Sequence, residues 1–311
     1  MNIKTFDLKF ITPCFCSGAD QKTAEIRSAS IRGELRWWFR ALGCTADEES
    51  HVFGGVAGRG GRKSKIMVRV SSQRYTSDPS VLPRVDGIDP ISYMLYFASV
   101  SGGRNGRMQS GAFIAPGSHF SLHIGISDKL NKDMESKLMR CLNLFFAFGS
   151  IGLRATRGSG AFGFCEINNR KSATQFQSFT NGISGLDTAV VCTSNGDPIW
   201  IEEDKWKLVY KVFGTILKEG YRQNCFKGRK WLSAGNNGTN PTPLGSAKPR
   251  QKSGLRFRPV LLRDGILPIL IYTDRFLGAE SRKLDFDMVT SCASGLEYTV
   301  KRIKDVVLTG S

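Results

Sequence analysis

The sequence lacks any long hydrophobic run, and this absence excludes a membrane-spanning helix. The densest apolar stretch, Leu142–Phe148, is much shorter than the ~18 residues that a span requires. The opening residues Met1–Thr5 lead directly into an alternating pattern, without the charged start and apolar core of an export signal. We therefore expect a cytoplasmic protein with no membrane partner.

Histidine is scarce, and the cysteines are scattered. The three histidines, His51, His119 and His123, belong to no paired motif of a kind that binds zinc or transfers protons. Cys14 and Cys16 form the one close cysteine pair, and no second pair at metal-ligand spacing accompanies them. Scattered cysteines in a large chain without an export signal are usually reduced thiols. We expect no structural metal and no cofactor.

Acidic residues are few compared with basic ones. The chain of 311 residues has 27 Asp and Glu against 44 Lys and Arg, which gives a net charge of +17. A charge of this size favours a phosphate-bearing partner. The excess is concentrated between Lys205 and Arg263, where fourteen basic residues accompany one acid, Glu219. This segment is therefore a candidate clamp for a polyanion.

Residues 233–254 form the polar centre of this basic segment. They are rich in Gly, Asn, Pro, Ser and Lys and have too few apolar residues to pack, which predicts a mobile loop. We expect its basic side chains Lys248, Arg250 and Lys252 to follow a phosphate backbone without reading bases. Trp231 and Phe257 are candidates either for base stacking or for the core.

The chain's most distinctive stretch is Ser30–Leu42, whose spacing predicts a helix with an N-cap at Ser30 and an end at Gly43. Ile31, Leu35, Trp38 and Leu42 recur at helical spacing and form an apolar stripe. Arg32, Arg36 and Arg40 lie in register on a neighbouring face, where they repel one another unless an anion neutralises them. The alternative is a solvated face with Glu34 as counter-charge.

The other periodic segments predict an α+β protein with domains at 1–168 and 169–311. In the first half, alternation or apolar runs predict strands at 3–12, 66–70, 91–98 and 120–126, and spacing predicts a helix at 134–148. A glycine-rich loop, 152–164, runs into a closing strand, which completes the order of a ferredoxin-like unit with insertions. In the second half we expect a strand at 187–192, a helix at 202–219, a hairpin of 255–261 with 266–272, and a helix beyond Asp274.

Several motifs of the first half together resemble those of a known family. They are Leu8–Pro13, Gly18–Asp20, Ser30–Leu42, Val52–Gly55 and Gly152–Gly160. These motifs resemble the RAMP proteins of CRISPR systems, and most closely the family of first-numbered subunits of the Cmr (type III-B) RNA-targeting effector. Residues 245–257 resemble that family's later basic segment more loosely.

The resemblance implies two tandem ferredoxin-like (RRM-like) domains with glycine-rich and basic loop insertions. It also implies a ribonucleoprotein subunit for antiviral defence, near the 3′ end of the guide RNA, with guide RNA, target RNA and other Cmr subunits as partners. We expect the first helix and the glycine-rich loop to form one RNA-facing surface. The expected RNA-binding residues are Arg32, Arg36, Arg40, Arg154, Arg157, Lys248, Arg250 and Lys252.

Two other functions stay open at this point. Some relatives cut RNA, so a guide-processing endoribonuclease is the runner-up, with Asp20 as its most interesting residue. Asp20 in Gly18-Ala19-Asp20 also suits a turn, and no HExxH, Walker loop or GxSxG motif is present, so we expect no catalytic residues. The third hypothesis is an assembly scaffold whose basic faces bind acidic protein subunits.

Overall fold

A computed structural model of the chain describes residues 1–20, 22–57, 60–75, 82, 89–95, 113–219, 246–247, 250–251, 254–273, 275, 286–291 and 296–309. The chain divides into two compact units. The first comprises residues 1–82, 110–155 and 159–170, and the second comprises residues 83–109, 156–158 and 171–311. The sequence predicts a single boundary after residue 168, whereas the two units interleave along the chain.

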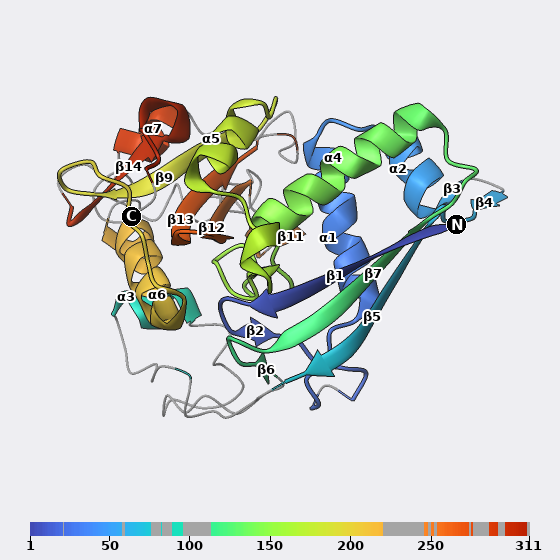
Figure 1. Ribbon diagram of the computed structural model, residues 1–311, viewed down its shortest axis with the longest axis horizontal. Coiled ribbons are helices and arrows are strands. Elements are labelled where there is room, and N and C mark those ends of the chain that lie inside the picture. Colours follow the sequence, from blue (N-terminus) through green and yellow to red (C-terminus); the bar gives the residue numbers. More distant parts are fainter. Residues whose placement is uncertain are drawn as a thin grey trace. The chain divides into compact units, whose positions relative to one another are not determined.

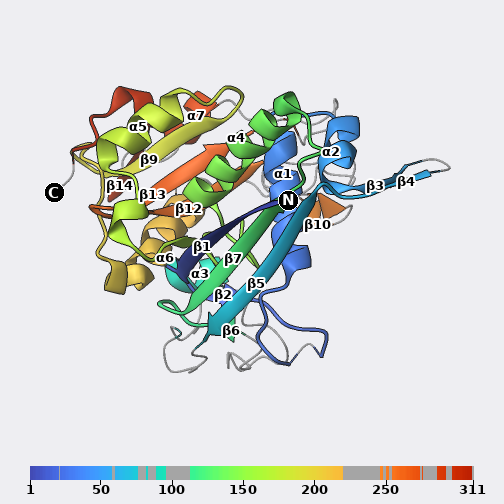
Figure 2. The ribbon, with the colours of Figure 1, turned by 45° about the vertical axis from the view of Figure 1, so that its right-hand side comes forward.

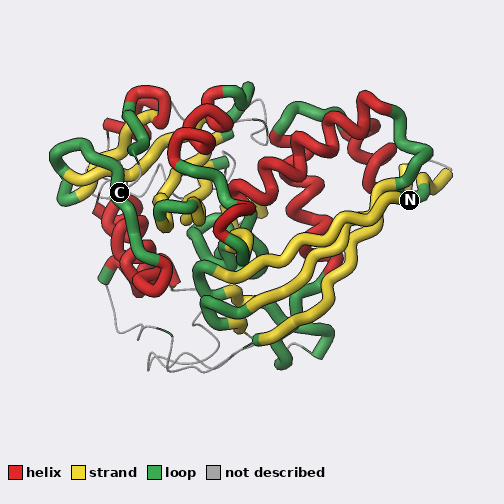
Figure 3. Tube along the Cα trace, viewed as in Figure 1, coloured by secondary structure: helices red, strands yellow, loops and turns green. Residues whose placement is uncertain are grey.

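The first unit is built on a four-stranded antiparallel sheet with the order β5-β7-β1-β8 (Figures 1 and 3). Helices α1 and α4 pack against one face of this sheet. The bounds are β1 Asn2–Phe10, α1 Ser28–Ala41, β5 Ile66–Arg74, β7 His119–Ile126, α4 Lys132–Phe148 and β8 Phe162–Phe164. The strands predicted at 3–12, 66–70 and 120–126 and the helix predicted at 134–148 are confirmed.

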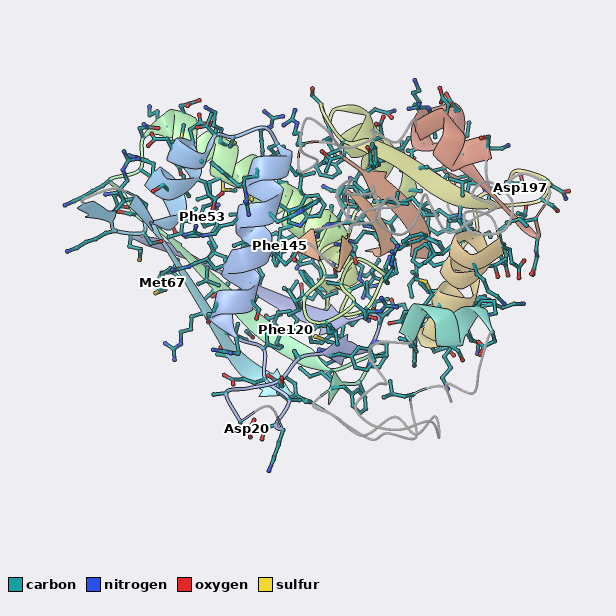
Figure 4. The ribbon with its side chains drawn as sticks, turned by 180° about the vertical axis from the view of Figure 1, so that it is seen from behind. Asp20, Phe53, Met67, Phe120, Phe145 and Asp197 are labelled. Carbon is teal, nitrogen blue, oxygen red and sulfur yellow. The ribbon has the colours of Figure 1, made fainter. Side chains whose placement is uncertain are left out.

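Aromatic rings fill the layer between sheet and helices. Phe120 of β7 stacks on Phe10 of β1 with ring centroids 5.1 Å apart. Phe145 of α4 lies at the same centroid distance from Phe162 of β8. Figure 4 shows Phe120 and Phe145 within this layer. Because successive strand residues point to opposite faces, the alternate residues of β1 lie on the uncovered face, where Asp7 is exposed.

Helix α1 begins three residues earlier than the sequence predicts. Its N-cap is Arg27, whose side chain makes no capping bond, so the assignment of Ser30 as the cap is wrong. The end is as expected, because Gly43 has φ 87 and its N–H donates to the Arg40 carbonyl. Ile31, Leu35 and Trp38 are fully buried, which confirms the apolar stripe at these three positions.

Three further features interrupt the first unit: one helix, one hairpin and one pair of short strands. Helix α2 (Ala46–Phe53) begins with a capping box in which Thr45 and Glu48 exchange side-chain and backbone hydrogen bonds. Strands β3 (Gly55–Ala57) and β4 (Gly60–Arg62) form a hairpin that projects from the unit (Figure 2). The short strand β2 (Cys14–Phe15) pairs with β6 (Phe113–Ile114). The sequence predicts none of these three features.

The strand predicted at 91–98 is wrong, since its described part is helix α3 (Pro90–Leu95). Asp89 caps this helix, accepting the N–H groups of Ile91 and Ser92 at 2.8 and 3.0 Å. Proline at the first helical position follows such a cap at no cost, because its missing N–H has no partner in a helix. Helix α3 belongs to the second unit, where a side chain at Gly214 would overlap the Pro90 carbonyl.

The second unit also has a four-stranded antiparallel sheet, with the order β12-β13-β9-β14. Its strands are β9 Asp187–Thr193, β12 Leu255–Leu262, β13 Gly265–Tyr272 and β14 Tyr298–Arg302. Its other helices are α5 Ala173–Asn181, α6 Trp206–Thr215 and α7 Phe286–Ser291, with 3-10 turns at Glu203–Lys205 and Ile303–Asp305. A further 3-10 turn, Ile167–Asn169, belongs to the first unit.

The main predictions for the second half are confirmed. Strand β9, helix α6 and the β12–β13 hairpin occupy the predicted segments, and the hairpin turns at Gly265, whose φ is 130. A short helix, α7, follows Asp274 as predicted. Helix α5 and strand β14 are not predicted from the sequence. Of the loop predicted at 233–254, strands β10 (Ser246–Ala247) and β11 (Arg250–Gln251) form a small hairpin, and the rest lies almost wholly outside the described residues.

Within the described ranges, no helix is long and apolar enough to cross a bilayer. The same residues contain no cluster of three or more His, Cys, Asp or Glu arranged to hold a metal ion. The sulfur atoms of Cys14 and Cys16 lie 3.5 Å apart as free thiols. Burial raises the pKa of the Cys14 thiol, whereas the hydrogen bond from Cys14 lowers the pKa of Cys16.

Candidate nucleic-acid interface

The three arginines of α1 have partners within the first unit. Arg36 donates to the Glu49 carboxylate at 2.9 Å and to the carbonyls of Phe53 and Gly54 at 3.2 and 2.5 Å. Arg40 forms an ion pair of 3.0 Å with the same carboxylate. Arg32 donates to the Ile66 carbonyl at 3.4 Å.

These contacts correct the expected electrostatics of α1. Glu49 of α2, whose side chain is only 11% exposed, is a counter-charge for Arg36 and Arg40. Glu49 was not identified from the sequence, because nothing local links residue 49 to residues 36 and 40. Arg36 therefore joins α1 to α2, and Arg40 is the more exposed of the two arginines that bind Glu49.

Substituting Arg36 with alanine is expected to lower the free energy of unfolding by about 2 kcal/mol, because it removes charge-assisted bonds to a nearly buried carboxylate and two carbonyls. Arg40→Ala is the matched control and should cost less, about 1 kcal/mol, because Arg40 is the more exposed of the two arginines that bind Glu49. Urea unfolding of both variants measures the difference. Equal losses would contradict the structural role assigned to Arg36.

The glycine-rich loop is held against β2 by backbone hydrogen bonds. Gly160 donates to the Pro13 carbonyl at 2.8 Å, and Leu153 donates to the Phe15 carbonyl at 2.8 Å. Ile151 donates to the Gly160 carbonyl at 3.0 Å, which closes the base of the loop. Gly152, Gly158 and Gly160 all have positive φ, so glycine is required at three turns of this loop.

Arg154 and Arg157 fall in different units. Arg154 belongs to the first unit and is half-exposed. Thr156–Gly158 belong to the second unit, where the Phe257 N–H donates to the Thr156 carbonyl at 3.1 Å. The Arg157 guanidinium lies 5.5 Å from the centroid of the Phe257 ring. Because Phe257 is fully buried and packs on Phe213, the suggestion that it stacks on bases is wrong.

Whether the first helix and the loop form one RNA-facing surface stays a prediction, and the contact of Arg32 lies at the far end of β1 from the loop. Arg32 reaches the Ile66 carbonyl, and the pairing of β5, β7 and β1 places Ile66 level with Asn2. The loop is bonded to Pro13, beyond Phe10 at the other end of β1. Eight residues of strand separate the two ends of β1, or about 26 Å.

Some of the described basic residues of Lys205–Arg263 are buried, and others form surface ion pairs. Arg256 and Arg258 of β12 are 2% and 0% exposed, so these two charges are buried and do not lie on an exposed clamp. Lys205 and Lys211 form ion pairs with Asp204 and Glu297 at 3.0 and 3.7 Å. Lys248 and Lys252, like Trp231, lie outside the described residues, and Arg250 is on β11.

The histidines and Asp20 are engaged in local contacts. His123 lies between the hydroxyls of Thr5 and Ser71, at 2.9 and 2.6 Å. His119 lies 3.2 Å from the Cys165 sulfur, and His51 is on α2. His119 and His123 both lie on β7 and have separate partners, and His51 is on a different element.

Asp20 stands at an exposed loop tip (Figure 4) and closes a turn. Its carboxylate accepts the Thr23 hydroxyl at 2.5 Å and the N–H groups of Lys22 and Thr23 at 3.0 and 2.9 Å. Hydrogen bonding by Thr23 lowers the pKa of Asp20, so the group is a carboxylate at neutral pH. These bonds are those of an Asx turn, the alternative that the sequence also favours.

The chain matches one protein-family model and two curated proteins. The model of the RAMP superfamily matches residues 7–163. The chain is 31% identical over 181 residues to CRISPR system Cmr subunit Cmr1-2 of Pyrococcus furiosus, covering 50% of this chain and 91% of that protein. It is 27% identical over 168 residues to subunit Cmr1-1 of the same organism, covering 52% of this chain and 47% of that protein.

Solved structures share the fold. The apo crystal structure of Cmr1 from Pyrococcus furiosus superposes with a TM-score of 0.55 at 17% identity, covering 96% of this chain and 98% of that one. A chain of the type III-B Cmr-beta complex bound to cognate target RNA superposes with a TM-score of 0.50 at 14% identity, covering 93% and 99%. At these identities the likeness concerns the fold alone.

Proposed function

Because this chain belongs to the RAMP superfamily and is a Cmr1-like protein, we propose that it is a non-catalytic RNA-binding subunit of a type III-B Cmr effector. Guide RNA, target RNA and the other Cmr subunits are its proposed partners. We place it near the 3′ end of the guide, where it helps to capture target RNA in antiviral defence.

The observation that carries RNA binding is the glycine-rich loop. Backbone bonds to Pro13 and Phe15 hold the loop in one conformation, and Arg154 is half-exposed within it. A loop already ordered before binding loses little conformational entropy when a ligand arrives. The net charge of +17 adds a long-range attraction for a polyanion.

We assign both units to the ferredoxin-like class, and this assignment supports the proposal. In each unit the main elements follow the order β-α-β-β-α-β, with the first strand between the third and the fourth in the sheet. RNA-binding modules of the RRM type share this order. The proposed domains, 1–168 and 169–311, describe the same two units apart from the segments that interleave.

A function without catalysis fits the contacts of the titratable groups. Metal-independent RNA cleavage needs a base for the 2′-hydroxyl and an acid for the leaving oxygen. Asp20 is committed to its turn, and His123 to two hydroxyls on neighbouring strands. The guide-processing endoribonuclease is therefore the second candidate. Cleavage of RNA by the purified protein would distinguish it from the non-catalytic subunit.

The test is to incubate the purified full chain with end-labelled single-stranded RNA. We expect binding whose affinity falls steeply between about 50 and 200 mM salt, by a log-log slope of about 0.7 for each phosphate contact. We expect no shortening of the RNA on a denaturing gel, with or without EDTA. Cleavage that Asp20→Ala or His51→Ala abolishes would establish the endoribonuclease instead. Assembly with Cmr subunits without any RNA affinity would establish the scaffold.

A further inference from the structure

Leu153 has an apolar side chain that is exposed to solvent. It is 54% exposed, although its backbone N–H is bonded to the Phe15 carbonyl and both neighbours belong to the pinned loop. An exposed leucine in a flexible segment can fold back on the surface. The backbone of Leu153 lacks that freedom.

The glycine-rich loop cannot change its conformation around Leu153, because two of its glycines pack closely against main-chain atoms of neighbouring segments. A Cβ atom on Gly152 would lie 2.6 Å from the Phe15 carbonyl oxygen, and one on Gly160 would overlap the Ile151 carbonyl. Both contacts are with main-chain atoms, which do not move aside as a long side chain does. Leu153 is therefore presented by a rigid support.

The next residue, Arg154, has φ 62 and is the one non-glycine residue of the described chain with positive φ. This left-handed conformation is unfavourable for arginine, and glycine would adopt it freely. The carbonyl of Arg154 accepts the Ser159 N–H at 3.3 Å, which maintains the turn. Strained residues of this kind cluster where a protein holds a ligand.

Among the described residues, the other large exposed apolar side chains have no such setting. Met1 and Val307 lie near the ends of the chain, Ile3 is on β1, Ile167 is in a 3-10 turn and Leu208 is on α6. Single exposed hydrophobic residues are ordinary on protein surfaces. Leu153 differs because a rigid glycine-rich loop and a strained arginine accompany it.

We propose that Leu153 is a wedge that packs against the face of an unpaired base in single-stranded RNA, with Arg154 contacting the neighbouring phosphate. The inference rests on the proposed RNA-binding function and names the contact at this loop. Leucine serves as a wedge between bases in other nucleic-acid complexes, and every base has an apolar face, so the contact is indifferent to sequence. A guanidinium beside the wedge suits the phosphate that follows each base.

The experiment uses the full chain and a set of single-stranded RNA oligonucleotides that carry 2-aminopurine at successive positions. Leu153→Ala is expected to bind about tenfold more weakly than the wild type, the effect of losing one base contact. The salt dependence should keep its slope, because no phosphate contact is removed. Fluorescence of the base unstacked by the wedge should rise with the wild type and not with Leu153→Ala.

Two control variants separate the contact from general effects. Leu153→Met keeps an apolar side chain of similar size and should retain affinity and fluorescence. Leu208→Ala removes another exposed leucine, on α6 of the second unit, and should behave as the wild type. Thermal unfolding of Leu153→Ala should match the wild type, since the side chain is exposed.

The outcomes distinguish this inference from the function on which it rests. Wild-type affinity and an unchanged fluorescence signal in Leu153→Ala would overturn the wedge and leave RNA binding intact. Normal RNA binding by Leu153→Ala together with failure to join the Cmr subunits would assign Leu153 to a protein contact, which also overturns it. A wild-type chain that binds no RNA would overturn both proposals.

Discussion

Substituting Gly160 with alanine is expected to lower the free energy of unfolding by about 3 kcal/mol, the sum of an overlap with main-chain atoms and of left-handed strain. The added Cβ would overlap the Ile151 carbonyl, and the φ of 63 disfavours any L side chain. The carbonyl cannot rotate away, because it belongs to the segment that closes the loop. Urea unfolding followed by circular dichroism measures the loss.

Gly33→Ala is the matched control. Gly33 is within α1, and a Cβ there would meet nothing within 4 Å. Alanine in place of glycine inside a helix should raise the free energy of unfolding by about 0.5–1 kcal/mol. Opposite signs for the two variants are therefore expected. Similar effects at both positions would show that the glycine-rich loop rearranges more easily than its contacts indicate.

The triple variant Lys248→Ala, Arg250→Ala and Lys252→Ala should bind single-stranded RNA about 100-fold more weakly near 0.1 M salt, if each residue contacts one phosphate. The log-log salt slope should flatten by about 2, because about 0.7 is lost for each contact. The weakening should be similar for all RNA sequences. Fluorescence anisotropy titrations at several salt concentrations measure both quantities.

A control with the same loss of charge comes from the second unit itself. Lys205, Lys207 and Lys211 lie on the 3-10 turn and helix α6, where Lys205 and Lys211 already form ion pairs. Their joint replacement by alanine should change the slope much less than the first triple variant does. If the first variant keeps the wild-type slope yet fails to join the other Cmr subunits, the segment 248–252 binds protein and the phosphate clamp is wrong.

Elements with a strong local pattern are predictable from the sequence. The alternation of Leu8 and Phe10, the spacing of Ile31, Leu35 and Trp38 in α1, and the turn at Gly265 each identify their element, since neighbouring residues alone set the period. Short helices whose start depends on a capping residue contain too few residues to show a repeating pattern of apolar positions. Helix α3 is an example, because its six residues are too few to separate a helical period from a buried strand, and its clearest signal is the cap at Asp89.

The site was predictable only in part. The motif Gly152–Gly160 identifies the loop, but it does not say that Leu153 is exposed or that Arg154 is strained. A count of charges places a clamp at Lys205–Arg263, whereas Arg256 and Arg258 are buried. Burial is a property of the packed unit, so a charge count cannot separate interior cations from surface ones.

The sequence by itself determined the basic character of the protein, its mixed α and β composition, the two main helices of the first unit and its membership of the RAMP superfamily. Periodicity, composition and motifs are properties of the sequence itself, so they can be determined without a structure. Only the tertiary structure decided that Glu49 pairs with Arg36 and Arg40, that α3 belongs to the second unit, and that the loop lies far along β1 from the contact of Arg32. Each of these depends on contacts between residues distant in the chain, and strand register and helix packing bring those residues together.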